Sequence, residues 1–278
     1  MADKRKIVSG WESIQGRRHT MEDIMTAVDD LNDEFDLKPD VQRSFWGVYD
    51  GHGGKQSSDF IGTFLHQELV NHPDFLTCKD YEALLTEVFK STDAKLLEDS
   101  KIKNYHDGCT AGVCLLIDNI MYFANIGDTE IMLVSKEGKA YKHKILSVIH
   151  RPDVEEEKKR VLDNGGKLLK GRICGNVIIS RSFGDFDYKY PQNKGKGDYV
   201  SAVPHTTSVK LTDDIKFLIL ACDGLWDNLS YTKICDIASN AFKSGASAIG
   251  VTEILVKAAL DANTTDNVTV TVVKLNEM

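Results

Sequence analysis

Four aspartates of this chain stand at the ends of predicted strands, where a side chain can leave the core and meet others. They are Asp50, Asp128, Asp223 and Asp266. Asp50 directly follows the apolar run 45–49, and Asp223 directly follows the run 217–222. Four acidic strand ends in one chain suggest that the carboxylates converge.

A simpler interpretation is that each of these aspartates begins an ordinary turn, because Asp-Gly is a common two-residue turn. A hairpin turn needs a strand on both sides, however. Asp50-Gly51 and Asp223-Gly224 are each followed by a predicted helix. For any one of these residues taken alone, both interpretations stay open.

If the carboxylates do meet, their repulsion requires a counter-charge. Two negative charges about 4 Å apart repel by about 4 kcal/mol at an effective dielectric constant near 20, so several bare carboxylates do not stay ionised together. Oxygen ligands favour Mg²⁺ or Mn²⁺ over zinc. Ions held in this way activate water and polarise phosphoryl oxygens. The residues by themselves therefore indicate a metal-dependent hydrolase, with phosphate esters as the expected substrates.

Other catalytic motifs are missing from the sequence. No cysteine has Cys-x5-Arg spacing, since Cys174 and Arg181 are one residue too far apart. A cysteinyl-phosphate mechanism therefore has no nucleophile. The sequence also contains neither a Gly-x4-Gly-Lys-Ser/Thr loop nor a Gly-x-Ser-x-Gly elbow.

The composition is that of a folded, acidic chain. Of its 278 residues, 42% are hydrophobic and 27% are charged. The 34 basic and 42 acidic residues give a net charge of −8, so we expect no binding to nucleic acid. The longest strongly apolar run, 217–222, is far shorter than the roughly 20 residues of a membrane span, and no membrane association is expected.

The cysteines and the N-terminus indicate where in the cell the protein is expected. None of the six cysteines forms a Cys-x-x-Cys pair, and we expect all six to be buried thiols. No apolar segment follows the charged N-terminus, and Ala2 stands where myristoylation requires glycine. We therefore expect the protein to lie in the cytoplasm, the nucleus or both. We also expect it to be a monomer.

Strand patterns recur along the chain and are joined mainly by short turns. The clearest are residues 43–49, 111–117, 121–126, 131–135, 140–144, 177–180, 217–222 and 268–274. Asp118-Asn119 and Glu137-Gly138 are typical of hairpin turns. In the last run valine alternates with threonine, which predicts a half-buried strand.

Helical patterns lie between the strands, at residues 57–70, 81–97, 152–162, 230–242 and 252–261. Lys189, Lys194 and Lys196 fall in a glycine-containing loop that we expect to be solvated. Because hairpins dominate the strand connections, the sheets should be mainly antiparallel, with helices packed outside them. The sequence thus predicts a single α+β domain over residues 1–278.

Eight segments, taken in order, resemble the metal-dependent serine/threonine phosphatases of the protein phosphatase 2C family. They are Arg18-His19-Thr20-Met21-Glu22-Asp23, Tyr49-Asp50-Gly51-His52-Gly53-Gly54, Gly108-Cys109-Thr110-Ala111, Asn125-Ile126-Gly127-Asp128, His150-Arg151-Pro152, Ser180-Arg181-Ser182-Phe183-Gly184-Asp185, Ala221-Cys222-Asp223-Gly224-Leu225-Trp226-Asp227 and Thr265-Asp266-Asn267-Val268-Thr269. The resemblance spans nearly the whole chain. It implies a four-layer αββα sandwich, with two mainly antiparallel sheets face to face and helix pairs outside.

The resemblance also implies a metal centre of Mn²⁺ or Mg²⁺. In the family's pattern Asp50 bridges two ions, the Gly51 carbonyl completes one site, and Asp223 and Asp266 hold the other ion. Asp128, together with Asp223, corresponds to the position of a third, weaker ion. Water between the two main ions attacks phosphorus directly, and no phosphoenzyme is formed.

The remaining roles are implied in the same way. Glu22 acts on the metals through water, together with Asp23. Arg18 clamps the phosphate, for which a guanidinium fork is suited. His52 protonates the departing seryl oxygen, a task for a side chain that titrates near neutrality.

The sequence also departs from the family's usual pattern. Glu130 stands where arginine is usual, Ile149 where an acid precedes the His-Lys-Pro motif, and Val203 where glutamate is usual. None of the three is an expected ligand, so hydrolysis should survive. Ile149 falls in the region that resembles the family's substrate flap, about residues 146–175, and bears on substrate preference. Arg181 is expected to form a structural ion pair.

The leading hypothesis is therefore a phosphatase that acts on phosphoserine and phosphothreonine in proteins. One alternative is a pseudophosphatase that uses the fold to bind partners, motivated by Glu130 and Ile149. Another is hydrolysis of phosphodiesters, which the negative net charge disfavours.

Overall fold

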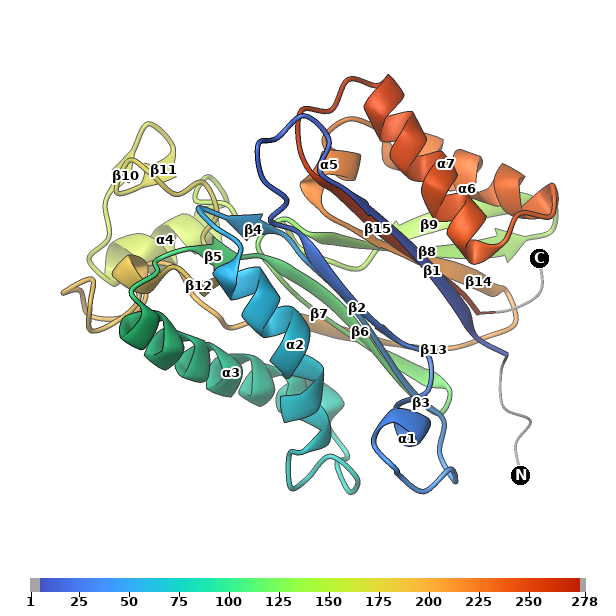
Figure 1. The fold of residues 1–278 in the computed structure, drawn as a ribbon, viewed down its shortest axis with the longest axis horizontal. Helices are drawn as coiled ribbons and strands as arrows, with labels where there is room; N and C mark the ends of the chain where they lie inside the picture. Colours follow the sequence, from blue (N-terminus) through green and yellow to red (C-terminus); the bar gives the residue numbers. More distant parts are fainter. Residues whose placement is uncertain (1–5, 276–278) are drawn as a thin grey trace.

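Two five-stranded antiparallel sheets form the centre of the protein in a computed structural model, which describes residues 6–275 (Figure 1). The first sheet has, in order, β1 (Val8–Ile14), β15 (Val268–Lys274), β14 (Ile215–Ala221), β8 (Glu130–Glu137) and β9 (Ala140–Ile145). The second has, in order, β13 (His205–Lys210), β7 (Ile120–Ile126), β6 (Ala111–Ile117), β3 (Arg43–Tyr49) and β2 (Ile24–Val28).

Apolar side chains from both sheets share one core between them. Trp46 and Phe123 come from the second sheet and Leu218 from the first, and all three are essentially fully buried. The indole N–H of Trp46 donates to Oδ1 of Asp29 at 2.9 Å, so its one polar group is satisfied. The sheets therefore pack face to face.

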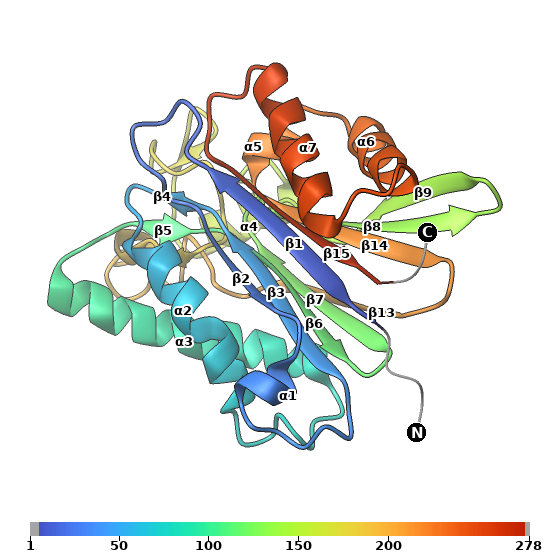
Figure 2. The same cartoon turned by 45° about the vertical axis from the view of Figure 1, so that its right-hand side comes forward.

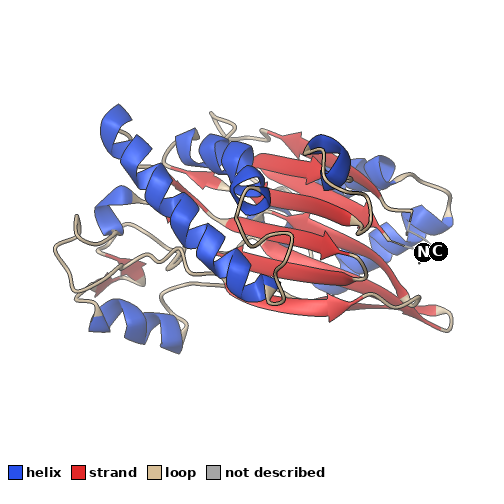
Figure 3. Ribbon diagram, turned by 90° about the horizontal axis from the view of Figure 1, so that it is seen from below, coloured by secondary structure: helices blue, strands red, loops and turns tan. Residues whose placement is uncertain are grey.

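Helices cover the outer faces of the two sheets. Helices α2 (Gln56–Val70) and α3 (Tyr81–Lys103) contact the second sheet, and α6 (Tyr231–Lys243) and α7 (Ala248–Asp261) contact the first. Figures 2 and 3 show the strands between these two groups of helices. Among residues 6–275, none of the helices combines the length and the apolar character that crossing a bilayer requires.

Shorter elements gather around the ends of the central strands. They are α1 (Leu31–Glu34), β4 (Gly51–His52), β5 (Gly108–Cys109), α4 (Glu155–Asp163), β10 (Leu168–Leu169), β11 (Arg172–Ile173), β12 (Phe183–Gly184), a 3₁₀ turn at Phe186–Tyr188 and α5 (Asp223–Trp226). In Figure 1, α4, β10 and β11 lie together at the left of the molecule. This group covers most of the region that the sequence assigned to a flap.

The expected mixed fold with mainly antiparallel sheets is confirmed, and several element boundaries differ. The second hairpin turns at Gly138 and Lys139, one residue later than predicted. Residues 177–180 are not a strand, because only Val177 makes an isolated bridge, to Ile173. The strand β15 is buried on both faces rather than one, because a sheet packs on one face and helices on the other.

Two helices are longer than their sequence patterns predicted. Helix α3 continues to Lys103 and ends at Asn104, whose left-handed φ of 57° closes the last turn. Helix α7 begins at Ala248, because the Ser247 side chain accepts a hydrogen bond from the backbone N–H of Gly250.

Two predictions of burial are wrong. Cys174 is exposed and Cys78 is half-buried, whereas we expected every cysteine to be buried. Lys189 is only 1% exposed, whereas we expected it in a solvated loop. Its Nζ lies 3.0 Å from Oδ2 of Asp93 and 2.9 Å from the Ser182 carbonyl oxygen. Oδ1 of Asp93 accepts the backbone N–H of Gly184 at 2.8 Å, so this buried pair holds the segment that leads into Asp185.

We expect Lys189→Ala to lower the free energy of unfolding by about 3–5 kcal/mol, because it leaves the Asp93 charge buried without its partner. Urea denaturation of the metal-free protein measures the difference. The exposed Lys196→Ala in the same loop is the matched control and should change the free energy by less than about 0.5 kcal/mol. Equal effects of the two substitutions would contradict the structural role given to Lys189.

Candidate metal centre

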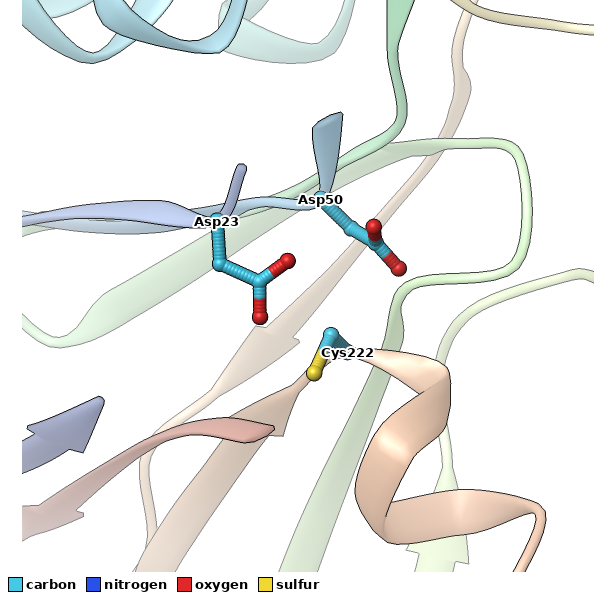
Figure 4. A group of neighbouring side chains, drawn as sticks. All are labelled: Asp23, Asp50 and Cys222. Atoms are coloured by element: carbon cyan, nitrogen blue, oxygen red, sulfur yellow. The ribbon is translucent and has the colours of Figure 1, made fainter. Parts of the chain in front are cut away.

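Three potential ligands converge where the ends of the two sheets meet. Their ligand atoms, on Asp23, Asp50 and Cys222, all lie within 4.8 Å of one another (Figure 4). Asp23 directly precedes β2 and Asp50 directly follows β3; the antiparallel pairing of these strands places the two aspartates side by side. Cys222 directly follows β14 of the other sheet. The centre therefore depends on the packing of both sheets.

A cavity of about 330 Å³ opens at this point. Eight of the nine residues that the sequence proposed for the site line it: Arg18, Glu22, Asp50, Gly51, His52, Asp128, Asp223 and Asp266. The ninth, Asp23, is buried beside Asp50 and does not line the cavity. The four aspartates at strand ends thus face one cavity instead of separate patches of solvent.

The glycines of the two Asp-Gly pairs permit close packing instead of forming hairpin turns. A Cβ atom on Gly51 would lie 2.4 Å from the carbonyl oxygen of Glu22, and one on Gly224 would lie 2.0 Å from that of Asn267. Because no larger residue fits there, each glycine lets a second segment of the site approach its neighbouring aspartate.

Burial and mutual repulsion disfavour the charged form of the clustered carboxylates. Burial raises the pKa of Asp50 well above its ordinary value, and the charges of Asp23 and Asp223 raise it further. Burial, followed by the charges of Asp128 and Asp266, raises the pKa of Asp223 to about 7. Burial also raises the pKa of Asp23, although hydrogen bonds to Cys222 and Thr269 oppose the shift.

The donor atoms at this cluster suit hard divalent cations. Oδ2 of Asp23 is buried and has no hydrogen-bond partner within the described part of the chain. Burial raises the pKa of Cys222 well above its ordinary value, so the sulfur stays a neutral thiol and the strong ligands are carboxylates. Oxygen donors of this kind match Mg²⁺ and Mn²⁺.

The Asn267 side chain joins the first and last segments of the site. Its Oδ1 accepts the backbone N–H of Glu22 at 2.9 Å, and its Nδ2 donates to the carbonyl oxygens of Gln15 and Thr20 at 2.8 and 2.9 Å. The loop that carries Arg18 is thereby attached to the start of β15. Asn267 belongs to the family-like segment Thr265–Thr269, but its residue type alone predicted no such role.

Arg18, which this loop carries, forms an ion pair with one carboxylate of the cavity. Its Nη2 lies 2.6 Å from Oδ2 of Asp266, while its side chain remains 57% exposed. A guanidinium group with one partner and free access to solvent can exchange that carboxylate for a phosphate.

His52 is held by an aspartate that the sequence reasoning did not single out. Its Nε2 lies 2.8 Å from Oδ2 of the buried Asp185, which also accepts a hydrogen bond from the Ser182 hydroxyl. Burial alone lowers the pKa of His52, but the charge of Asp185 and the hydrogen bond to it outweigh burial and raise that pKa. The imidazole is therefore favoured as a proton donor.

Asp128 and the unusual Glu130 have different partners. Nε and Nη2 of Arg151 donate to Oδ2 of Asp128 at 3.2 and 2.9 Å. Glu130 is buried and accepts the Tyr231 hydroxyl at 2.8 Å. Burial raises the pKa of Glu130 to about 7, although the hydrogen bond from Tyr231 opposes the shift.

The segment wrongly predicted as a strand helps to form the cavity wall. Val177, Ile178 and Ile179 line it together with Arg172 and Asn176. Arg181, which follows this segment, makes the expected structural ion pair: its Nη2 lies 2.6 Å from Oε1 of the buried Glu157.

We expect the metal-free protein to lose stability as the pH rises from about 4 to about 7. Because the pKa of Asp223 is about 7 in the folded protein against an ordinary 3.8, this side chain keeps its proton in the folded state and releases it in the unfolded chain over this range. Glu130, with a pKa of about 7, acts in the same direction, whereas the buried His150, with a pKa of about 3, acts against it. The melting temperature in EDTA should be higher at about pH 5.5 than at about pH 7.5, and Mn²⁺ should reverse the loss. Asp223→Asn should flatten the profile, whereas the exposed Asp153→Asn should not. The same pH profile in the unmodified protein and in Asp223→Asn would contradict the repulsion described above.

Comparisons with known proteins agree with this geometry. Residues 7–268 match the family "Protein phosphatase 2C". Protein spalten of Dictyostelium discoideum is 35% identical over 286 residues, covering 99% of this chain and 28% of that protein. Protein phosphatase 2C homolog 3 of Schizosaccharomyces pombe is 36% identical over 275 residues, covering 97% of this chain and 64% of that protein. The chain therefore spans less than two thirds of the length of these relatives.

The fold has solved counterparts. The crystal structure of serine-threonine phosphatase 2C from Toxoplasma gondii superposes with a TM-score of 0.84 at 21% identity, covering 99% of this chain and 96% of that one. At this identity the likeness concerns the fold. With the family match over nearly all of the described residues, the conclusion is that this chain belongs to the protein phosphatase 2C family.

Proposed function

We propose that this chain is a Mn²⁺- or Mg²⁺-dependent phosphatase that hydrolyses phosphoserine and phosphothreonine in proteins. The observation that carries the proposal is the arrangement of the cavity, where partly buried carboxylates, Arg18 and His52 face the same space. Membership of the phosphatase family supports the same reaction.

Asp50, Asp223 and Asp266 are the residues that would hold two ions, with the Gly51 carbonyl as a further ligand and Glu22 supporting through water. Asp23 is buried beside Asp50, so we assign it a larger supporting role in metal binding than the sequence suggested. Divalent ions at such carboxylates act as Lewis acids on phosphoryl oxygens and lower the pKa of water to near neutrality.

The chain's own side chains account for substrate binding and proton transfer. Arg18 releases Asp266 and donates to two oxygens of the phosphate, which fixes the orientation of the ester. His52, oriented by Asp185, gives its proton to the departing serine or threonine oxygen. Ile178 and Ile179 on the cavity wall limit the access of water to the reacting ester.

The pseudophosphatase alternative has weaker support. The hydroxyl of Tyr231 on α6 satisfies Glu130, and Ile149 borders a separate groove with Val148 and Val154. Neither departure replaces one of the clustered carboxylates. The location and the monomeric state stay predictions.

We expect Asp50→Asn to reduce hydrolysis of a phosphothreonine peptide by about 100-fold or more, because it removes the central carboxylate of the cluster. Chelation with EDTA should have the same effect on the unmodified protein and should be reversible with Mn²⁺. Release of inorganic phosphate measures both. Asp59→Asn, a change in α2 at a side chain that is 43% exposed, is the control and should retain activity.

A folded protein that releases no phosphate from any phosphopeptide at saturating Mn²⁺ would favour the pseudophosphatase instead. Faster hydrolysis of a model phosphodiester than of a phosphomonoester would favour the phosphodiesterase alternative.

We expect His52→Gln to slow hydrolysis of a phosphoserine peptide by about 100-fold, but that of p-nitrophenyl phosphate by less than about tenfold. The alkoxide of serine needs a proton as it leaves, whereas p-nitrophenolate does not. Values of kcat for both substrates, measured on the same preparation, give the comparison. Equal losses would show that His52 does not act as the acid.

A further inference from the structure

Arg151 is bonded to Asp128, a residue that lines the carboxylate cavity and that the family pattern associates with a third ion. Both its Nε, at 3.2 Å, and its Nη2, at 2.9 Å, donate to the same oxygen, Oδ2 of Asp128. Asp128 is 6% exposed, so this oxygen has little access to water as an alternative partner. The guanidinium group thus occupies a lone-pair position that a cation would need.

Two backbone hydrogen bonds of the preceding residue, His150, hold Arg151 in this position. The N–H of the preceding residue, His150, donates to the Gly127 carbonyl oxygen at 2.9 Å, directly before Asp128. The carbonyl oxygen of His150 accepts the N–H of Ser180 at 2.9 Å. Gly127 is itself fixed, because its φ is 79° and a Cβ there would lie 2.4 Å from the Thr110 side chain. The backbone contacts between the segments that carry Asp128 and Arg151 therefore fix the pairing of these two residues.

The two arginines that are bonded to carboxylates of the cavity, Arg18 and Arg151, differ in their freedom to move. Arg18 makes one hydrogen bond to Asp266 and its side chain is 57% exposed. Arg151 makes two hydrogen bonds to Asp128 and its side chain is 30% exposed. Arg18 is placed to change partners during a reaction cycle, whereas Arg151 is placed to remain.

Charges farther away also keep Arg151 in place. Burial works against its charged form, but the bond to Asp128 and the charges of Asp227 and Asp223 raise the pKa of Arg151. The adjacent Glu130, which stands where the family usually has arginine, supplies no positive charge. The permanent cation beside Asp128 therefore comes from position 151.

We propose that Arg151 is a built-in counter-ion of Asp128, and that a divalent ion enters between Asp128 and Asp223 only by displacing it. The proposal rests on the metal binding put forward above and adds a residue that sets the affinity of the weakest site. Binding of the ion and the arginine–carboxylate bond exclude each other, so each must weaken the other by the same factor. The two main ions, held around Asp50, do not compete with Arg151.

The test counts Mn²⁺ ions and their affinities in the full chain, by isothermal titration and by the electron paramagnetic resonance signal of free Mn²⁺. In Arg151→Gln the weakest class of sites should bind about tenfold more tightly than in the unmodified protein, while the tighter classes stay within about twofold. Arg151→Lys, which keeps the charge without the fork, should lie between the two. Lys159→Gln, an equal loss of charge at an exposed position of α4, should change nothing.

A second measurement assigns the weakest site. Asp128→Asn should abolish the gain in affinity when combined with Arg151→Gln, and an anomalous-scattering map of Mn²⁺-soaked Arg151→Gln crystals should show an ion between Asp128 and Asp223. If Arg151→Gln fails to fold by circular dichroism, the milder Arg151→Lys decides the question by the same titration.

Unchanged or weaker binding at the third site in a folded Arg151 variant would overturn the proposal, because the arginine would then be a support and not a competitor. If two ions bind tightly and the Arg151 variants do not change the affinity of the third site, the proposed phosphatase function is not contradicted. No Mn²⁺ binding by any variant would overturn the metal centre and this proposal together.

Discussion

The repulsion among buried carboxylates is the constraint on which the rest of this structure depends. Burial raises the pKa of Asp23, Asp50 and Asp223 because it removes the water that would otherwise screen them, and the charges of neighbouring aspartates raise each pKa further. Without divalent ions the cluster must take up protons or rely on Arg18 and Arg151 as counter-charges. The same repulsion makes the site selective for cations, since an ion relieves a free-energy cost that the fold has already imposed.

Packing between distant segments keeps the carboxylates together against this repulsion. The two sheets meet through a shared apolar core, and each delivers strand ends to the same place. Asn267 attaches the loop that carries Arg18 to the start of β15. Gly51 and Gly224 allow backbone approaches that any Cβ would block. Because the site exists only when these long-range contacts form, metal binding and folding stability should be coupled.

A second set of buried polar contacts supports His52, the proposed catalytic acid. The Lys189–Asp93 pair holds Gly184, and the next residue, Asp185, holds His52. A buried ion pair of this kind adds little to the net free energy of folding, but it restricts its segment to a single conformation. The His52 side chain is thus positioned rigidly, whereas Arg18 is exposed and free to change partners.

The sequence alone determined the features that local patterns encode, including the strand Arg43–Tyr49 and the strand ends that carry Asp50 and Asp223. Alternation and turn residues act over a few positions, so they are visible without a structure. The burial of Lys189, the grip of Asp185 on His52 and the pairing of Arg151 with Asp128 were decided by tertiary structure. Each of these joins residues 23 to 133 positions apart, and no local pattern records which distant partner will neutralise a buried charge.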